Sequence, residues 1–458
     1  MPAQTHDDYG LTVYTTWKIS FKELTPPAAT LLQLCSFLHH QGISEQIFSN
    51  AFIYTFPADG PSKEELQGPL GILSQFVDPA SGWYSLRFMD LINQLIEYSL
   101  ISFDPVTKMF SIHPLVHKWS QSTLTDQRVS HSHMVAIVGM SFGAIPEETK
   151  CVASMQLLAH LDSLLQGDTA IALDFGLEYA EIYSWGGQHK KAEPLALAVL
   201  YRRRDTLEED HLDILTAMDY VAEIYHELGR LQEAEALQSV FFEERNMILG
   251  EDHPATLIAM GNLAKTYHQL GRLQEAKPLQ FLVLKKRRSI LGEDHPSTPT
   301  AMLHLAGTYR RLGQMQEAEA LQRGVLEKQR TTLGEEHSQT LTTMNSLALT
   351  YQDLGRVLEA EALQSVVFKK QKTILGEDHP ETLRAMDNLA NTYLQLGRLQ
   401  EAEVLQSVVF EKQKSIYGEN HPETLCVMAN LPKTYHQLGR IQKAEALTRR
   451  QASLVWQH

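Results

Sequence analysis

The sequence predicts an all-α protein in which stacked helix hairpins form a superhelical solenoid, preceded by a small domain with a β-hairpin. The first observation is a glycine that returns every 42 residues, in the column Gly250, Gly292, Gly334, Gly376 and Gly418. Self-similarity at a fixed period of this size is typical of solenoids. A second glycine column keeps the same period about half a unit away, so each unit has two helix stops and therefore two helices (Gly187, Gly229, Gly271, Gly313, Gly355, Gly397 and Gly439).

The unit from Glu251 to Gly292 illustrates the two helices. We expect the first to begin at Pro254, because proline suits the first helical position, and to end at a left-handed Gly271. The second should begin near Leu273 and end with the basic run 285–288, which favours the carboxyl end of the helix dipole. Since one hairpin cannot cover its own apolar face, the units must stack into one continuous core. Six units run from about Glu209 onward, and a divergent seventh lies around residues 173–207.

The first-helix and turn residues carry a family resemblance. The segments LAKTY and LGRLQEA, with Leu263, Ala264, Tyr267 and Ala276 at the small and aromatic positions, resemble the tetratricopeptide pattern. The 42-residue form with LGEDHP between units resembles the repeats of kinesin light chains. The usual phenylalanine position holds Gln280, and the late proline position holds Arg288, so the packing of the helix pairs should differ in detail. This resemblance covers residues 171–458.

The resemblance implies a protein or peptide ligand in a concave groove, because the variable first-helix face lines the groove in tetratricopeptide arrays. Polar positions on that face are our candidates for partner binding: Asp219, Glu223, His226, Asn262, Lys265, His268, Arg310, Asn345, Gln352, Asn388, Asn391 and Asn430. Three of the asparagines resemble residues that hold peptide backbone in light-chain repeats. The alternative, that these are solvated residues of the first helices, stays open.

Residues 24–125 have the element order of a small winged-helix domain, three helical segments and then a hairpin. Ile101 and Phe103 should face Phe110 and Ile112 across a turn. This part resembles the winged-helix portion of NB-ARC signalling ATPases, the STAND or NLR-like receptors that in fungi often carry light-chain-like repeats. Residues 1–23 then resemble the end of the helical part of the ATPase, and residues 126–170 a helical linker.

His113 falls on the Met-His-Asp motif of that family, in which the histidine contacts the phosphate of bound ADP. Pro114 replaces the aspartate, however, and the chain contains no GxxxxGK[ST] phosphate-binding loop. We therefore predict no nucleotide hydrolysis, and nucleotide binding only together with a separate P-loop chain. The prediction is the non-catalytic sensor or scaffold half of such a receptor.

Composition narrows the class of partner. A net charge of −15 argues against nucleic acid and favours a basic partner. Three well-separated cysteines indicate a reducing cytoplasm, and no apolar stretch is long enough to span a bilayer. No cofactor or metal is expected, because the histidines that recur before each first helix should act as caps on successive repeats (His211, His253, His295, His337, His379 and His421).

Two other functions fit the sequence less well than this prediction, and a third stays open. Residues 139–143 match the GxSxG motif of hydrolases, but the α/β sheet that such a serine needs is missing, so we interpret Ser141 as a coincidence. A cargo adaptor of the kinesin-light-chain type would carry heptads before the repeats, and residues 1–130 show no sustained heptad pattern. The remaining alternative is an ATPase component that acts through His113 on a nucleotide held by another chain.

Overall fold

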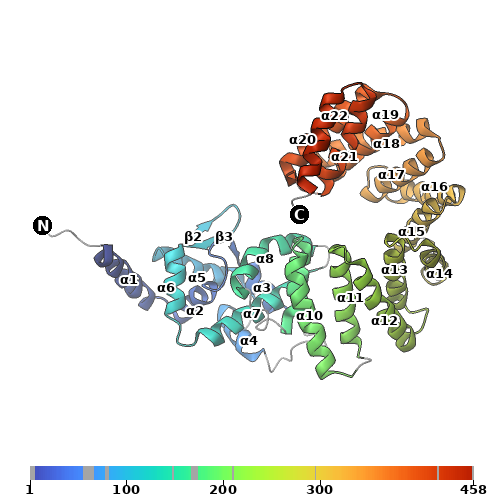
Figure 1. Ribbon diagram of the computed structural model, residues 1–458. Helices are drawn as coiled ribbons and strands as arrows, with labels where there is room; N and C mark the ends of the chain where they lie inside the picture. The colour runs from blue at the N-terminus through green and yellow to red at the C-terminus, as the bar shows by residue number, and fades with distance from the viewer. Residues whose placement is uncertain are drawn as a thin grey trace. The chain divides into compact units, whose positions relative to one another are not determined.

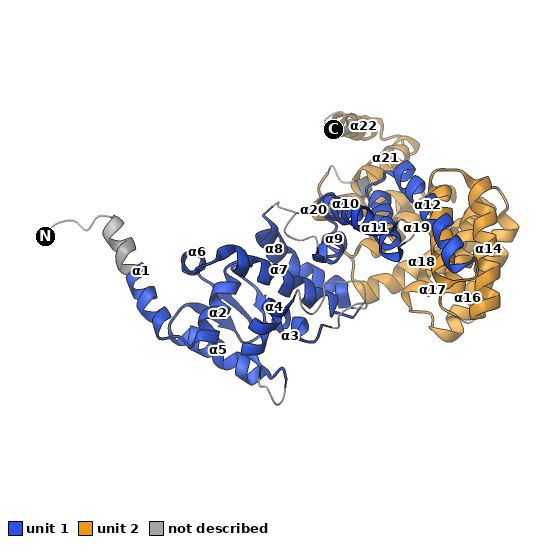
Figure 2. Ribbon diagram, turned by 90° about the horizontal axis from the view of Figure 1, so that it is seen from below, with its two compact units in different colours: residues 1–250 blue, residues 251–458 orange. Residues whose placement is uncertain are grey.

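The computed structural model describes residues 6–54, 66–77, 82–146, 149–166, 174–208, 211–293, 295–419 and 422–455. The chain divides into two compact units, residues 1–250 and 251–458 (Figure 2). None of the described helices has the length and apolarity needed to cross a lipid bilayer.

Unit 1 combines helices of 7 to 19 residues with a small sheet (Figure 1). Its elements are α1 (His6–Lys22), α2 (Pro26–Cys35), β1 (Ile43–Ser44), α3 (Gln46–Phe52), α4 (Gln67–Leu73), the 3-10 turn η1 (Ser74–Phe76), α5 (Ser85–Glu97), β2 (Ile101–Asp104), β3 (Met109–Ile112), α6 (Pro114–Ser122), α7 (Gln127–Gly143), α8 (Lys150–Leu165), α9 (Gly176–Trp185), α10 (His189–Thr206), α11 (Leu212–Glu227) and α12 (Leu231–Leu249).

The predicted hairpin is present. Strands β2 and β3 pair antiparallel with Ile101 opposite Ile112 and Phe103 opposite Phe110, and β1 joins the other edge to give the order β1-β3-β2. The turn forms because the Asp104 carboxylate accepts the backbone N–H of Val106 at 2.9 Å. Apolar rings fill the space behind this sheet, for example Phe48 and Phe88 with ring centroids 5.6 Å apart.

The helices after the hairpin are part of the packed core. Helix α7 contacts α2, α3, α4, α8 and α9. Gly139 of α7 lies against Phe175, and an added Cβ would come within 2.2 Å of the Phe175 ring. Ser141 lies inside α7, is 1% exposed, and donates to the backbone oxygen of Gln46 at 3.5 Å. A serine inside a helix cannot form the strand-to-helix elbow of a hydrolase, so the interpretation as a coincidence is confirmed.

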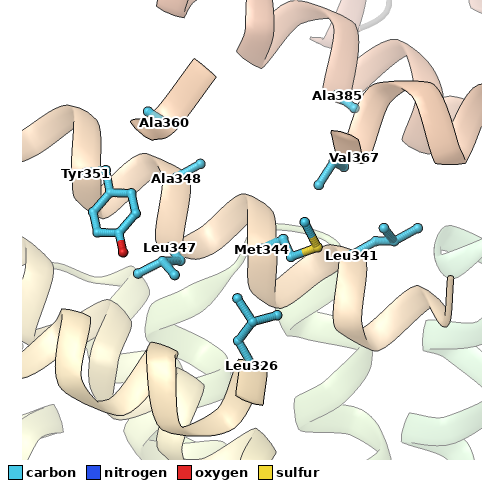
Figure 3. Packing of buried hydrophobic residues seen from close by; sticks show 9 residues of the cluster. All are labelled: Leu326, Leu341, Met344, Leu347, Ala348, Tyr351, Ala360, Val367 and Ala385. Atoms are coloured by element: carbon cyan, nitrogen blue, oxygen red, sulfur yellow. The ribbon is translucent and has the colours of Figure 1, made fainter. Parts of the chain in front are cut away.

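Unit 2 consists of helix hairpins, each packed on the next. Its helices are α13 (Pro254–Gln269), α14 (Leu273–Leu291), α15 (Ser297–Arg311), α16 (Met315–Thr332), α17 (Ser338–Asp353), α18 (Val357–Leu375), α19 (Pro380–Gln395), α20 (Leu399–Tyr417), α21 (Pro422–Gln437) and α22 (Ile441–Val455). Figure 3 shows one shared core, in which Leu326 of α16 meets Met344 and Leu347 of α17, with Val367 of α18 and Ala385 of α19 nearby.

The helix starts and stops follow the sequence. Helix α13 begins at Pro254, as predicted, and the ring of His253 accepts the backbone N–H of Ala255 at 3.2 Å. His211, His295, His337 and His379 accept an N–H in the same way, which confirms the cap role, while His421 lies outside the described residues. Gly271 has φ +78°, the predicted left-handed stop. Gly292 has φ +86° and ψ 168°, a conformation open essentially to glycine alone.

Polar bonds inside the core join neighbouring hairpins of unit 2. A buried glutamine in the second helix accepts a hydrogen bond from a buried threonine of the next first helix. In this way Thr350 Oγ1 donates to Gln322 Oε1 at 2.7 Å, and Thr434 Oγ1 donates to Gln406 Oε1 at 2.6 Å. The glutamine in place of the usual phenylalanine therefore bonds one hairpin to the next.

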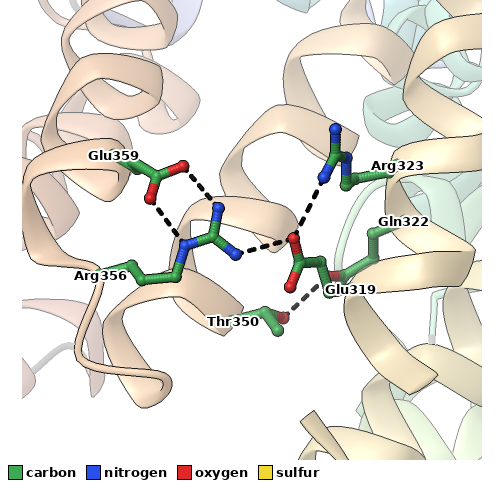
Figure 4. Close-up of polar contacts among 6 residues, drawn as sticks. All are labelled: Glu319, Gln322, Arg323, Thr350, Arg356 and Glu359. Atoms are coloured by element: carbon green, nitrogen blue, oxygen red, sulfur yellow. Dashed lines mark hydrogen bonds and ion pairs between the residues drawn. The ribbon is translucent and has the colours of Figure 1, made fainter. Parts of the chain in front are cut away.

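At several hairpins the arginine after the turn glycine forms a second join (Figure 4), whereas Gly187 and Gly313 are followed by glutamine. Arg356 Nη1 donates to Glu319 of the preceding hairpin at 2.8 Å, and Nε donates to Glu359 of its own second helix at 2.7 Å. Its guanidinium carbon also lies 4.1 Å from the centroid of the Tyr351 ring. Arg398 repeats this arrangement with Glu361, Glu401 and Tyr393.

Candidate functional site

A cavity of about 200 Å³ opens among helices α13, α14 and α15 of unit 2. Two of the predicted binding residues, Asn262 and Lys265, line it together. Residues of the other two helices complete it, among them Gln280 and Arg287 of α14 and His304 of α15. The cavity therefore lies between one hairpin and the next.

The cavity has room because position 261 is a glycine. An added Cβ at Gly261 would come within 3.9 Å of Arg287 Nη2, so a longer side chain would enter the space in front of the guanidinium. In the hairpin 42 residues earlier the equivalent pair is Asp219 and Arg245. There burial lowers the pKa of Arg245, and the Asp219 carboxylate acts against that change. Gly261 thus removes the carboxylate that the equivalent arginine faces.

The cavity is cationic. Burial lowers the pKa of Arg287, whose Nη1 donates to the backbone oxygen of Ser297 at 3.0 Å. Burial also lowers the pKa of His304, and the neighbouring charges of Lys265 and Arg287 lower it further. Among the described residues none that lines this cavity is acidic. An anionic group is the ligand that would balance these charges.

One polar atom in the wall of the cavity is unsatisfied. The Gln280 side chain is only 5% exposed, and within the described part of the chain its Oε1 has no hydrogen-bond partner. The threonine that would bond it by analogy with the other hairpins, Thr308, instead pairs with His268 Nδ1 at 2.8 Å. A ligand that brings a donor as well as an anion would satisfy this atom.

The comparisons with known proteins agree with the helix hairpins. A tetratricopeptide-repeat family model matches residues 168–239, 297–369 and 339–409, and a second tetratricopeptide model matches residues 256–297. Nearly identical TPR-like repeats from a Podosopora anserina protein named as a kinesin light chain share 31% identity with the chain. That match covers 44% of this chain and 96% of the other, with a TM-score of 0.41. The protein belongs to the tetratricopeptide-repeat family.

Other comparisons are more distant. Residues 19–129 match a domain family of unknown function, DUF7779. The STAND protein PH0952 of Pyrococcus horikoshii, which has a tetratricopeptide-repeat sensor, matches at 13% identity and a TM-score of 0.46 over 99% of this chain and 65% of the other. The structure of NprR with its cognate peptide NprX, a B. thuringiensis quorum sensor, matches at 15% identity and 0.46 over 66% and 86%. No curated protein matches the chain.

Several predicted groove residues of this tetratricopeptide protein are used between its own hairpins. His268 bonds Thr308, Gln352 Nε2 donates to Thr392 Oγ1 at 2.5 Å, and Arg310 pairs with Asp353 at 3.3 Å. The asparagines also find partners on the same face: Asn388 Nδ2 donates to Asn345 Oδ1 at 3.1 Å, Asn391 Nδ2 to Asp387 at 3.4 Å, and Lys433 to Asn430 Oδ1 at 3.5 Å. These contacts order the first-helix face.

Three of the candidates in unit 1, Asp219, Glu223 and His226, lie on helix α11, but they do not line one cavity together. His226 Nδ1 is 3.3 Å from Glu227 Oε1. Glu223 lines a cavity of about 400 Å³ with Trp185, and Asp219 does not line it. His113 caps α6, since its Nδ1 accepts the N–H of Leu115 at 3.3 Å.

Sequence reasoning missed Arg287, His304 and Gln280 as parts of the tetratricopeptide site. The helix dipole alone accounts for a basic residue such as Arg287 at the end of a second helix, and Gln280 is only a departure from the family pattern. The sequence signal that could have revealed this site is the glycine at position 261. The equivalent positions in the other repeats hold larger residues, Asp219, Leu303, Asn345 and Asp387. A glycine among larger residues marks a place where space is left.

Proposed function

We propose that the protein is the non-catalytic sensor or scaffold half of a STAND-type signalling protein, and that unit 2 binds an acidic segment of a protein or peptide partner. The observation that carries the binding proposal is the cationic cavity of Lys265 and Arg287, beside the imidazole of His304. A carboxylate placed there would take the position that Asp219 occupies relative to Arg245 in the preceding hairpin.

The size of the cavity fits one side chain of an extended partner. Complete small-molecule sites usually enclose about 300–1,000 Å³, whereas this cavity has about 200 Å³. A glutamate or aspartate side chain would bind Arg287 and Lys265, while its backbone N–H would be available to Gln280 Oε1. Charge-assisted bonds of this kind contribute about 1.5–3 kcal/mol each, and so roughly tenfold or more in affinity.

The test is a selection from a random peptide library on the full chain, followed by fluorescence anisotropy with the selected peptides. We expect acidic peptides whose affinity falls at least about tenfold with Lys265→Glu. Lys369→Glu is the matched control, because Lys369 is an exposed lysine of α18 outside the cavity. Selected peptides without acidic residues, or equal losses with both variants, would refute the proposal.

The receptor part of the proposal rests on residues 24–125. Their order of helix, strand, helices and hairpin, with the sheet order β1-β3-β2, supports a winged-helix domain. Because the sequence contains no GxxxxGK[ST] loop, a role of His113 in nucleotide sensing requires a second chain with a P-loop. ADP that raises the melting temperature of the chain by itself would contradict this assignment.

A cargo adaptor is the second candidate function. The observation that favours it is the 31% identity to repeats of a protein named as a kinesin light chain. Direct binding of the full chain to the coiled coil of a kinesin heavy chain, measured by analytical ultracentrifugation, would support the adaptor over the receptor.

A further inference from the structure

The cationic cavity of unit 2 differs in charge from the equivalent places in the neighbouring repeats. Gly261 and Lys265 of α13 and Arg287 of α14 line it, and these three positions have a net charge of +2. One repeat earlier the same positions have a net charge of −1 (Asp219, Glu223 and Arg245), and one repeat later they carry no charge (Leu303, Gly307 and Gln329). The pair of cations therefore belongs to this repeat and is not imposed by the repeat pattern.

The two cations converge and have no counter-charge in the cavity. Each of them lowers the pKa of the same imidazole, that of His304. Arg287 Nη1 donates to a neutral acceptor, the backbone oxygen of Ser297, at 3.0 Å. Burial lowers the pKa of Arg287, and no carboxylate of the described residues opposes this change. A ligand would therefore meet both positive charges at one place.

A single carboxylate would compensate only half of this charge. It carries one negative charge, so Lys265 and Arg287 together would keep a net positive charge around it. A phosphate monoester carries about −1.5 to −2 charges at pH 7 and has three strong acceptor oxygens. Arginine binds such a group through two parallel N–H bonds, and lysine binds it as a point charge. The two cations thus match a phosphate monoester better than a glutamate or aspartate side chain.

The neighbouring side chains supply further donors. Asn262 and His304 line the same cavity. Because the pKa of His304 is lowered, its ring is neutral at pH 7 and offers one N–H, and the Asn262 amide offers two. With Lys265 and Arg287 these groups present more N–H donors than the two oxygens of a carboxylate can use. A third oxygen in the ligand would engage more of them.

One atom of the wall indicates that the phosphate is attached to a peptide. Gln280 is 5% exposed, and its Oε1 lacks a donor within the described part of the chain. A free phosphate dianion has no hydrogen to donate, whereas a phosphorylated residue has its backbone N–H. Ile258, Val283 and Ala301 also line the cavity and would contact the apolar carbons of such a residue.

We propose that the segment bound by this cavity carries a phosphorylated serine or threonine, whose phosphate pairs with Lys265 and Arg287 while its backbone N–H donates to Gln280 Oε1. The inference rests on the function proposed above and replaces a general acidic side chain by one chemical class. It also adds regulation, because the partner would bind unit 2 only after a kinase has modified it.

The test uses three degenerate nonapeptide libraries that differ only in a fixed central residue, which is phosphoserine, glutamate or serine. Each library is selected on the full chain at about pH 7.5, where the phosphate is a dianion. The selected sequences are then made with all three central residues and measured by fluorescence anisotropy. We expect phosphoserine to bind at least about tenfold more tightly than glutamate, and serine to bind more weakly than both. Inorganic phosphate at the concentration of the peptide should not displace it.

Two variants locate the effect through the ratio of phosphoserine to glutamate affinity. Lys265→Gln leaves one cation, which a carboxylate can balance, so the ratio should fall to within about twofold. Lys285→Gln is the matched control and should keep the ratio, because Lys285 is an exposed lysine of α14 outside the cavity. Since both peptides are measured on the same protein, partial unfolding of a variant does not change the ratio.

The outcomes separate this inference from the function on which it rests. Equal affinity for the phosphoserine and glutamate peptides would overturn the inference and leave the binding of acidic segments standing. Failure of both kinds of peptide to bind would refute the two together. Displacement by an equal concentration of inorganic phosphate, or the same fall in ratio with Lys285→Gln as with Lys265→Gln, would also overturn the inference.

Discussion

The buried bond between Thr350 and Gln322 allows a direct measurement of how one hairpin is joined to the next. Thr350 is 0% exposed and Gln322 is 2% exposed, and their bond is 2.7 Å long. Thr350→Val keeps the shape of the side chain and removes only the hydroxyl. Gln322 Oε1 then loses its donor in a place that water does not reach, which costs about 1–3 kcal/mol of unfolding free energy.

The partner substitution should cost less. In Gln322→Leu the Thr350 hydroxyl keeps an acceptor, because the backbone oxygen of Ser346 lies 3.3 Å away. The cost then reduces to the lost bond, about 1 kcal/mol. With both substitutions the site is apolar on both sides, so the double variant should lose less than the sum, with a coupling energy of about 1–2 kcal/mol.

The assay is urea unfolding of the four proteins, with hydrogen exchange of α16 and α17 to localise the change. Thr342→Val is the control, because Thr342 is exposed on the same helix and its hydroxyl donates to the backbone oxygen of Ser338 within its own turn. That control should stay within about 0.5 kcal/mol. A loss in Thr350→Val no larger than in the control, or strictly additive losses, would refute the role of this bond in joining the hairpins.

Three further predictions concern the backbone, the histidines and the cysteines. Gly355→Ala should destabilise the protein by about 1–2 kcal/mol, because φ is +76° there. Gly324→Ala should stabilise it by about 0.5–1 kcal/mol, because Gly324 lies inside α16 and an added Cβ would make only an ordinary contact with Met302. Thermal unfolding of both variants measures the two changes. Burial lowers the pKa of His117 and His160 below the ordinary 6.5. Their neutral forms therefore stabilise unit 1 above pH 6.5, and this stability is lost as the pH falls through the folded-state pKa values. Melting temperatures measured from pH 8 to pH 5 should show this loss. Burial raises the pKa of Cys35 far above its usual range, so a thiol reagent should label the two exposed cysteines of the folded chain and reach Cys35 only after unfolding.

The hairpin boundaries could be predicted because their signals are local. A proline at the first helical position and a glycine with positive φ act within a few residues, so Pro254 and Gly271 revealed both ends of α13. The Gln–Thr bonds could not be predicted in this way. Gln322 and its donor Thr350 lie 28 residues apart, in different hairpins. Only the geometry of stacking shows that one column faces the other.

The candidate site was predicted in part for a related reason. Lys265 and Asn262 could be predicted because they lie on a first helix, where the family resemblance places partner-binding residues. Arg287 and His304 come from the second helix and from the next repeat, so no pattern within one first helix connects them. Polar side chains such as Gln352 could not be assigned for a different reason. A polar residue on the first-helix face can bind a partner or bond the neighbouring hairpin, and the sequence does not distinguish the two.

The joins between hairpins also bear on how the length of this array can change during evolution. Arg356 reaches back to Glu319 and Arg398 to Glu361, in both cases across 37 residues. Removing the 42-residue unit 356–397 would therefore bring Arg398 opposite Glu319, which is the equivalent of Glu361. Unequal recombination between such copies should produce shorter or longer proteins that still fold, whereas an in-frame deletion of any other length would misalign both kinds of join.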